Sequence, residues 1–250
     1  MSGHSKWSTI KRKKEKEDQK RGKIFTKLIK EITVAARIGG GDPETNPRLR
    51  QAIDDATDEN MPKDNIEKAI LRGTGDLPGV SYEDMTYEGY GPNGTALFIE
   101  CTTDNKNRTV SEIRHLLDKH DGSLGESGSV SWVFDRKGVV YISKEGNTED
   151  DLMLAALENG AEDISEEEEF FEVTCPMEEF HNLKTGIEDA GFDVQESELQ
   201  QIPKNTVDVT GTEAKKLMRL LEALEDHDDV QNVWSNADID EDSLAEADAS

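Results

Sequence analysis

The sequence is short of cysteine, aromatic residues and long apolar runs. Among its 250 residues there are 2 Cys, and aromatic side chains make up 6%. Cys101 and Cys175 each lie in an apolar run and form no CxxC pair, so we expect buried reduced thiols rather than a disulfide or a metal site. No apolar run approaches the roughly 18–20 residues of a membrane helix, and no apolar stretch follows Met1 as in a secretory signal. We therefore expect a cytoplasmic protein with no membrane contact.

The chain also lacks the motifs of enzymes and metal centres. Its His residues form no HExxH pattern or ligand-spaced cluster, and its Ser residues form no GxSxG elbow. Gly89–Gly94 (GYGPNG) matches the dinucleotide motif GxGxxG, but it precedes an expected strand instead of opening a helix, which predicts a tight turn. The polar run Thr103–Thr109 (TDNKNRT) suggests catalysis, but a helix N-cap explains it more simply. We predict no catalytic residue, no metal, no cofactor and no enzymatic activity.

One sign of charge dominates most of the chain. The formal net charge is −26, whereas Met1–Gly40 holds 12 Lys or Arg against 4 acidic residues, a balance of +8. The residues after Gly40 therefore carry −34. Because more lysine is a poor route to solubility in so acidic a protein, the basic start predicts a contact with a polyanion.

This basic start includes a histidine and a tryptophan. A basic arm with an aromatic side chain neutralises phosphates and stacks on an exposed base, which gives salt-dependent and largely sequence-independent binding. Plain solvation and an acidic protein partner are the alternatives. The predicted nucleic-acid contacts are His4, Lys6, Trp7, Lys11, Arg12, Lys13, Lys14, Lys20, Arg21 and Lys23, and the secondary surface candidates are Asn107, Arg108 and Arg114.

Apolar residues at helical spacing predict a bundle of three short helices at the start of the chain. The first covers residues 24–36 and stops at Gly39-Gly40-Gly41. The second has Asn46 as its N-cap and Pro47 as its first residue. The third covers Pro62–Arg72 and is expected to end at Gly73.

Strands alternate with helices after the Gly- and Pro-rich segment 73–81. The expected elements are a strand at Thr95–Thr102, a helix at Arg108–His120 and a strand at Val130–Phe134. A matching set follows near the end: a strand at Thr206–Val209, a helix opened by a Thr210–Glu213 capping box, and a strand at Val230–Trp234. Between the two sets, strands are expected at 139–142, 170–174 and 193–200, and helices at 149–159 and 177–190.

These patterns predict an α+β, multi-domain fold. It has an N-terminal three-helix bundle and two ferredoxin-like α+β domains, one inserted into the other. The expected domains are a basic-armed helical bundle at 1–78, a discontinuous α+β domain at 79–136 plus 204–237, and an inserted α+β domain at 137–203. Residues 238–250 are expected to form a disordered acidic tail.

Several stretches together resemble the YebC/PmpR family. They are GHSKWSTIKRKK from Gly3, KRGKIFTKLIKEITVAARIGGGDPETNPRLRQAI from Lys20, MPKDNIEKAI from Met61, YEGYGPNG from Tyr87, TDNKNRTVSEIRH from Thr103 and GSLGESGSVSWVF from Gly122. The resemblance runs from Gly3 to about Asn236. It implies a fold of three domains, a helical bundle and two α+β domains of which one interrupts the other.

The resemblance also implies a function. Members of the family are named probable transcriptional regulatory proteins, and some are described as DNA-binding. Mitochondrial relatives are translational activators of cytochrome c oxidase, and bacterial relatives have been linked to ribosomes stalled on proline-rich stretches. The resemblance therefore implies a non-enzymatic cytoplasmic regulator that contacts nucleic acid.

Two functions stay open. The first is a DNA-binding transcriptional regulator, and the alternative is a ribosome-associated translation factor whose arm contacts ribosomal RNA. Structured RNA offers unpaired bases to Trp7, which duplex DNA does not. The third helix is also weakly basic for a DNA-recognition helix. We expect a monomer. Its expected partner is a nucleic acid, either DNA or ribosomal RNA, and the second function adds the ribosome.

Overall fold

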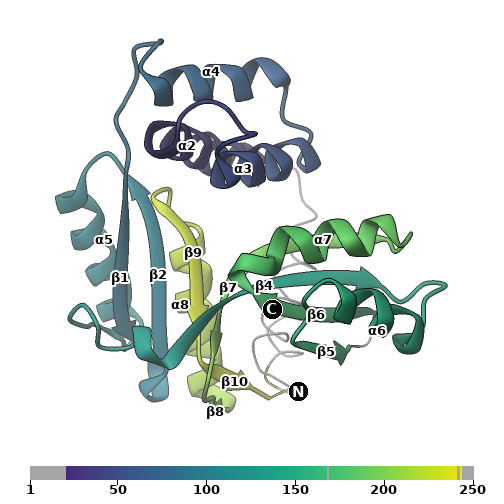
Figure 1. Cartoon of the computed structure of the whole chain (residues 1–250). Coiled ribbons are helices and arrows are strands. Elements are labelled where there is room, and N and C mark those ends of the chain that lie inside the picture. The colour runs from purple at the N-terminus through teal and green to yellow at the C-terminus, as the bar shows by residue number, and fades with distance from the viewer. Residues whose placement is uncertain (1–20, 168, 241–242, 244–250) are drawn as a thin grey trace.

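The computed structural model describes residues 21–167, 169–240 and 243 of the 250. In this part of the chain a helical bundle is followed by two units that combine sheets with helices (Figure 1). The α+β, multi-domain fold class predicted from the sequence is confirmed. None of the helices described is both long enough and apolar enough to cross a membrane.

Three helices form the bundle: α2 (Arg21–Gly39), α3 (Pro47–Asp58) and α4 (Lys63–Thr74). Asn46 caps α3 as predicted, because its side chain accepts a hydrogen bond from the Leu49 N–H at 3.2 Å and donates to the carbonyl oxygens of Ala35 and Gly40. The apolar stripes of the helices meet in a core built from Ile32, Ala35, Ala36, Leu49, Ala52, Ala56, Met61, Ile66 and Ala69.

The predicted end of α4 at Gly73 is wrong. The helix continues to Thr74, and Gly75, at φ +87°, provides the left-handed C-cap. A Cβ on Gly73 would overlap the carbonyl oxygen of Thr33 and lie 2.7 Å from the Cβ of Ala36. Gly73 therefore allows α4 to cross α2 closely, and it does not end the helix.

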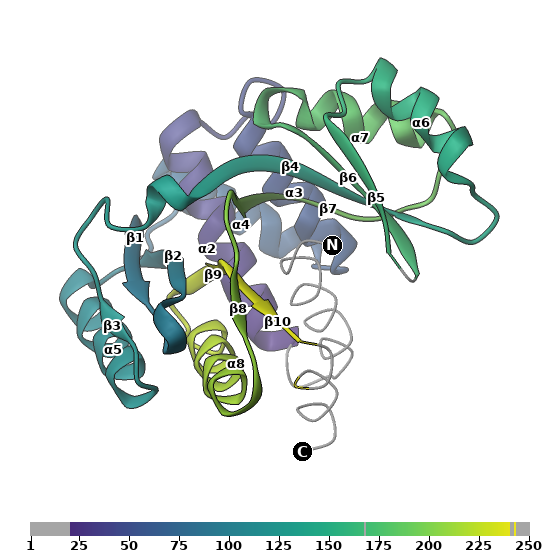
Figure 2. The same ribbon diagram turned by 90° about the horizontal axis from the view of Figure 1, so that it is seen from below.

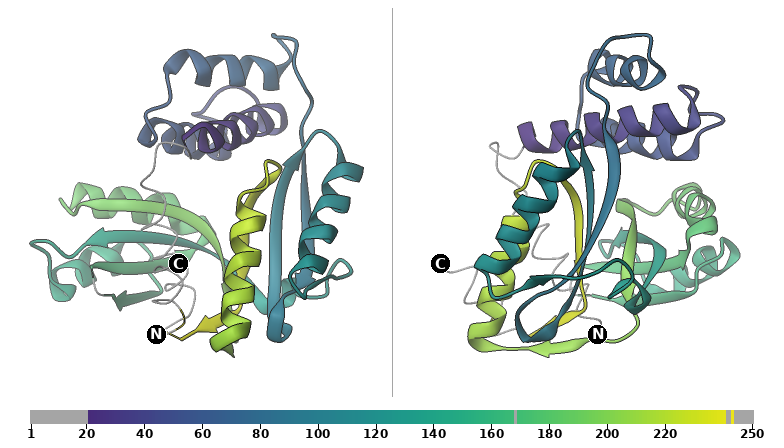
Figure 3. Two further views of the ribbon diagram at one scale, coloured as in Figure 1. Left: turned by 180° about the vertical axis from the view of Figure 1, so that it is seen from behind. Right: turned by 90° about the vertical axis from the view of Figure 1, so that its left-hand side faces the viewer.

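The second unit has an antiparallel sheet in the order β3-β1-β2-β9. Helices α5 and α8 pack on one face of it, and Figure 3 shows them side by side. Gly89–Gly94 turns the chain between β1 and β2 through the short 3-10 helix η1 (Pro92–Gly94), as predicted. The bounds are β1 (Glu83–Tyr90), β2 (Ala96–Thr103), α5 (Lys106–Lys119), β3 (Ser123–Leu124), α8 (Gly211–Glu225) and β9 (Val230–Ser235).

Three expectations for this unit are wrong. Residues 130–134 do not form a strand: they form the 3-10 helix η2 (Ser131–Val133), and the next strand starts at Phe134. Strand β8 (Val207–Val209) pairs in parallel with β10 (Ala237–Ile239) instead of entering the sheet of β9. The Thr210 side chain makes no capping hydrogen bond, and the Gly211 N–H donates to the Ser243 hydroxyl at 2.9 Å instead.

The expected acidic tail is also shorter than predicted on its N-terminal side. Ile239, in β10, is 3% exposed and packs into the core of the second unit. Ser243 is buried as well. The acidic residues obscured a strand here, in which two inward apolar residues, Ala237 and Ile239, are enough to anchor so short an element.

The inserted unit runs β4-α6-β5-β6-α7-β7, with a sheet in the order β5-β6-β4-β7. Neighbouring strands are antiparallel, which is the ferredoxin-like arrangement. Strand β5 (Asp163–Glu166) was not among the strands expected from the sequence, and it overlaps the beginning of the acidic run at residues 165–169. The bounds are β4 (Phe134–Ser143), α6 (Glu149–Glu158), β5 (Asp163–Glu166), β6 (Phe170–Pro176), η3 (Met177–Glu179), α7 (Phe180–Asp189) and β7 (Val194–Pro203).

Each of the three units has an apolar core of its own. Cys101 lies in the core of the second unit and Cys175 in that of the inserted unit, and both are buried free thiols, as predicted. Strand β4 crosses the expected boundary between residues 136 and 137 without a break. Seen from below in Figure 2, the two units lie side by side beneath the bundle.

Candidate nucleic-acid interface

The structure describes only part of the predicted interface. His4, Lys6, Trp7, Lys11, Arg12, Lys13, Lys14 and Lys20 lie outside the described residues. Arg21 is the first residue of α2, and Lys23 follows in its first turn. Asn107 and Arg114 are exposed on α5. The described part therefore shows where the basic segment joins the fold and what holds that joint in place.

The start of α2 is fixed to the acidic turn between α8 and β9. Lys23 pairs with Asp226 at 3.1 Å, and the Lys27 ammonium donates to the carbonyl oxygen of Glu225 at 2.9 Å. Lys30, one turn further, donates to the carbonyl oxygen of Asp228 at 2.7 Å. These lysines recur at i, i+4 and i+7, so they share one face of the helix. Their positive charges are therefore engaged in contacts within the protein.

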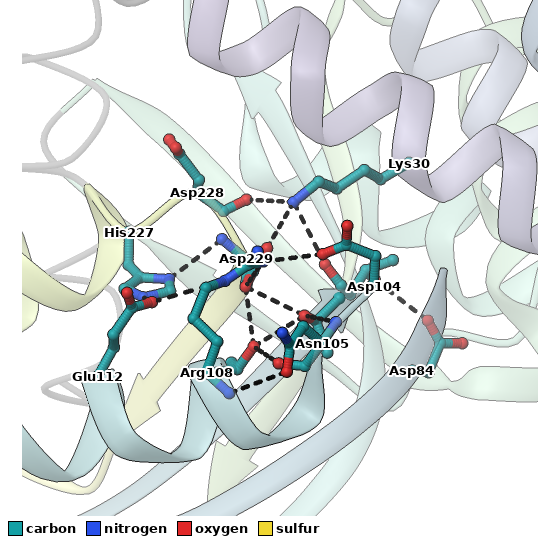
Figure 4. A network of polar contacts seen from close by, with 12 residues as sticks. Lys30, Asp84, Asp104, Asn105, Arg108, Glu112, His227, Asp228 and Asp229 are labelled. Atoms are coloured by element: carbon teal, nitrogen blue, oxygen red, sulfur yellow. Dashed lines mark hydrogen bonds and ion pairs between the residues drawn. The ribbon is translucent and has the colours of Figure 1, made fainter. Parts of the chain in front are cut away.

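Asp229 is the centre of this contact (Figure 4). It pairs with Lys30 at 2.9 Å and Arg108 at 2.7 Å, and the Asp229 and Lys30 side chains are 3% and 7% exposed. It also accepts hydrogen bonds from the hydroxyls of Thr103 and Thr109. Burial alone would raise the Asp229 pKa. The donors, Arg108 first and then Lys30 and Thr109, outweigh it and hold that pKa well below its usual value.

The predicted polar run TDNKNRT supplies half of this network. Asn105 caps α5 by accepting from the Arg108 N–H at 3.1 Å, as the N-cap interpretation requires. The Arg108 guanidinium bridges Asp104 and Asp229, so this secondary surface candidate is engaged within the fold. The arrangement gives the run a structural task, which is to hold the beginning of α5 against β9 and α2.

His227 completes the turn. Its Nδ1 accepts a hydrogen bond from the Asp229 N–H at 3.1 Å, which places the ring proton on Nε2, where it donates to Glu112 at 2.9 Å. Glu112, His227 and Asp229 could therefore provide a cluster of metal ligands. However, Lys30 and Arg108 already neutralise Asp229 and the backbone occupies Nδ1, so the residues present fit a polar junction better than a metal centre.

A second ionic contact joins the bundle to β1. Arg48 of α3 binds both carboxylate oxygens of Glu31 at 2.6 and 2.8 Å, and it also binds Asp84 at 2.7 Å. Asp84 in turn accepts from the Thr102 hydroxyl at 3.1 Å. The hydrogen bond to Glu31 makes the largest contribution to a raised Arg48 pKa. Two separate ionic contacts, at Asp229 and at Asp84, therefore position the bundle on the second unit.

A shallow pocket of about 270 Å³ lies between α2, α4 and the segment that leads to β1. Arg37 and Arg72 line it, and Arg37 donates to the Ser81 hydroxyl at 3.0 Å. Each arginine is in the last turn of its helix, where a cation offsets the negative helix end. This placement accounts for both residues without a ligand.

Sequence reasoning missed Lys30, Thr109, His227 and Asp229. No local pattern links them, because Lys30 and Asp229 are 199 residues apart. One signal was available, namely the i, i+4, i+7 spacing of lysines on a helix that also carries an apolar stripe. Such a charged stripe indicates a second contact surface, and the acidic sequence EDHDD at Glu225–Asp229 is its natural complement.

The fold and this junction define a three-unit α+β protein whose basic N-terminal helix is fastened to an acidic turn. The chain belongs to the TACO1/YebC family. Residues 5–76 match the TACO1/YebC protein N-terminal domain, and residues 82–237 match the TACO1/YebC second and third domain. The resemblance to this family predicted from the motifs is confirmed.

Relatives of the chain agree over nearly its whole length. A probable transcriptional regulatory protein of Desulfotalea psychrophila is 58% identical over 245 residues, covering 98% of both chains. One of Desulfatibacillum aliphaticivorans is 55% identical, covering 98% of this chain and 100% of the relative. The crystal structure of a conserved hypothetical protein from Aquifex aeolicus is 45% identical, with a TM-score of 0.82 over 90% of this chain and 93% of that one. At family level, the chain is a regulator.

Proposed function

We propose that this regulator acts by binding nucleic acid through its basic N-terminal segment, and that it is first of all a DNA-binding transcriptional regulator. The observation that carries the proposal is the division of charge. Residues 1–40 carry +8 and the remainder −34. Nucleic-acid affinity comes largely from cations that neutralise phosphates, and the basic segment concentrates those cations at one end of the chain.

The junction at Asp229 supports this proposal mechanically. Lys23, Lys27 and Lys30 hold the first turns of α2 against the α8–β9 turn. The seven Lys and Arg of residues 1–20 are therefore attached to the fold at a fixed point. The acidic remainder repels phosphates, so the cations of the basic end make the main phosphate contacts. The names of the relatives support the transcriptional function.

An rRNA-associated translation factor is the second candidate, and the low positive charge of α4 favours it. In the described part of the chain, α3 and α4 are joined by a short turn, as in helix-turn-helix proteins, so α4 would be the helix that reads DNA. However, α4 presents Lys63, Lys68 and Arg72 together with Asp64 and Glu67, which is too little positive charge for a recognition helix. Residues 1–20 bind structured RNA as readily as DNA under this alternative, because phosphate contacts are common to both. Neither candidate includes a catalysed reaction or a cofactor, and both describe a cytoplasmic monomer.

One experiment separates the two candidates. The full chain is crosslinked to nucleic acid in native extract at low salt, and the bound material is sequenced. Enrichment of promoter DNA supports the transcriptional regulator, whereas enrichment of ribosomal RNA alone contradicts it and supports the translation factor. Recovery of neither contradicts the proposal as a whole.

A second experiment tests the basic segment itself. Replacing Lys11, Arg12, Lys13 and Lys14 with Ala removes four cations, and each lost phosphate contact lowers the log–log salt slope by about 0.9 on duplex DNA. The matched control removes four exposed cations elsewhere, at Lys63, Lys68, Arg72 and Lys119. We expect the slope to fall in the first variant only. Equal slopes in the two variants would place the contact outside the basic segment.

A further inference from the structure

A tryptophan is exposed at the one place where the sequence pattern would bury it. In a strand, Val130, Trp132 and Phe134 would share a face. The chain instead forms the 3-10 helix η2, whose three-residue turn directs Val130 and Val133 into a small apolar cluster that also contains Phe134. Trp132 points away from this cluster and is 65% exposed. A single exposed apolar side chain is common on protein surfaces, so the surroundings of Trp132 decide whether it forms a contact surface.

The indole ring is held in a fixed orientation. Its Nε1–H donates to the carbonyl oxygen of Ser129 at 3.0 Å. The hydroxyl of Tyr90, a residue that is 39% exposed, donates to the same oxygen at 3.3 Å. One backbone atom therefore aligns two neighbouring exposed aromatic side chains, one from β1 and one from η2.

The loop that carries this oxygen is itself fixed by a buried carboxylate. Glu88 is 7% exposed and accepts hydrogen bonds from the N–H groups of Gly128, Val130 and Ser131 at 2.7, 2.7 and 2.8 Å. Burial alone would raise the pKa of Glu88, but these backbone donors outweigh it and lower that pKa. A loop with three such bonds presents Trp132 as a rigid surface.

We propose that Trp132 and Tyr90 form a stacking platform for an unpaired nucleobase. This inference rests on the proposed function, and it adds the kind of nucleic acid, which is single-stranded or contains unpaired bases. Aromatic faces stack on any base, whereas the bases of an intact duplex are not accessible to them. Lys204 pairs with Asp135, three residues from Trp132, at 2.9 Å, so the positive charge of this lysine is engaged within the fold.

The platform and the basic segment then divide the work of binding. Under the proposed function, the basic segment supplies phosphate contacts that are independent of sequence and of base pairing. Trp132 provides preference for unpaired segments. A single protein with both parts binds a looped or unwound strand more tightly than a closed duplex.

The test measures the affinity of the full chain for two probes. One is a fluorescein-labelled single-stranded oligouridine RNA of about 20 nucleotides, and the other is a DNA duplex of the same length. Trp132→Leu keeps an apolar side chain but removes the aromatic face, and Trp132→Phe restores a face. We expect Trp132→Leu to weaken RNA binding by about 5- to 150-fold, with Trp132→Phe close to wild type and duplex binding equal in all three.

The outcomes distinguish the two proposals. If wild type binds neither probe, the proposed function fails and the platform fails with it. If wild type binds RNA and Trp132→Leu binds it equally well, the platform is overturned while the proposed function stands. Equal losses on RNA and duplex also overturn the platform, because a lost base contact would spare the duplex. Circular dichroism confirms that the variants are folded.

A fluorescence measurement follows the ring directly. The chain has three Trp, so the difference between the emission of wild type and that of Trp132→Phe, a variant expected to bind RNA, reports on Trp132. We expect iodide to quench this difference signal strongly without RNA and less when the oligouridine is bound. Poor quenching without RNA would mean that Trp132 is already covered, and equal quenching with and without RNA would mean that no base covers it; either result would overturn the platform.

Discussion

The helical bundle faces the rest of the chain in several places, and two of them contain aspartates whose pKa values are shifted in opposite directions. At the contact between α2 and the α8–β9 turn, Asp229 is paired with Lys30 and Arg108, and its pKa is held well below the usual value. Where α3 faces α7, burial raises the pKa of Asp55 to about 6, and Lys184 only partly offsets that effect (Figure 1).

This difference teaches that a buried carboxylate is favourable or costly according to its donors. Asp229 has two cations and two hydroxyls, so its charged form is stabilised. Asp55 has a hydrogen bond from Gln51 at 2.7 Å and the neighbouring acids Asp54 and Asp58, which disfavour its charge. At neutral pH the charged form of Asp229 therefore stabilises the first contact, whereas the charged form of Asp55 destabilises the second.

The largest expected effect comes from removing the cation at the first contact. Lys30→Met leaves the buried Asp229 with Arg108 as its one remaining ionic partner among the described residues. We expect the free energy of unfolding to fall by about 3 kcal/mol, measured by urea denaturation near pH 7.5. A fall of less than about 1 kcal/mol would mean that Arg108 alone satisfies Asp229.

The next effect has the opposite sign. Asp55→Asn keeps the acceptor for Gln51 and removes the buried charge. The folded pKa of Asp55 is about 6 and the unfolded value is near 3.8, so wild-type stability falls as pH rises through this window and the full penalty applies above it. We expect Asp55→Asn to stabilise the protein by about 1 kcal/mol at pH 7.5 and to match wild type near pH 4. An equal gain at both pH values would contradict the electrostatic explanation.

A smaller effect is expected at Lys184, whose positive charge partly lowers the raised pKa of Asp55. Lys184→Met removes this cation, so the Asp55 pKa should rise further and stability should fall by about 0.5 kcal/mol at pH 7.5. In the Asp55→Asn background the same substitution should have no effect. A double-mutant cycle of urea unfolding measures the coupling, and a loss that persists in that background would mean that Lys184 acts through packing.

The smallest effect is expected at the edge of the first contact. The Lys23–Asp226 pair is exposed, with 49% and 70% of the two side chains accessible. Solvent screening makes such pairs nearly neutral, so Lys23→Met should change stability by no more than about 0.5 kcal/mol. This substitution is therefore the matched control for Lys30→Met on the same helix face. Similar losses in both would remove the distinction between the buried and the exposed lysine.

Much of the fold could be predicted because its signals are local. Asn46 and Pro47 mark the beginning of α3, and apolar spacing located the other helices to within a few residues. The errors have tertiary causes. Gly73 has the sequence of a helix stop, but close packing on Thr33 and Ala36 decides its role. Residues 130–134 read as a strand because their apolar residues alternate, whereas the Glu88 carboxylate, 42 residues away from Val130, holds them in another conformation.

The candidate site was predicted from composition more than from geometry. Charge located the basic segment, and the capping role of Asn105 followed from residue type. The pairing of Arg108 with Asp229 could not be predicted in this way, because the two residues come together only when α8 and β9 are folded. The exposure of Trp132 was not predicted for a similar reason. It depends on a turn of the backbone, and the alternation of apolar residues in the sequence does not reveal that turn. Long-range polar contacts leave few traces in a single sequence.

The antiparallel pair of β4 and β7 is the point at which the inserted unit joins the rest of the chain. Arg136 lies opposite Gln201, so the strand that enters the inserted unit and the strand that leaves it are neighbours. Excising residues 137–200 and closing the gap with Asn-Gly would give a two-residue hairpin of the favoured type. The pairing of β4 with β7 thus keeps the two ends of such a cut side by side, so the shortened chain would close without a long loop.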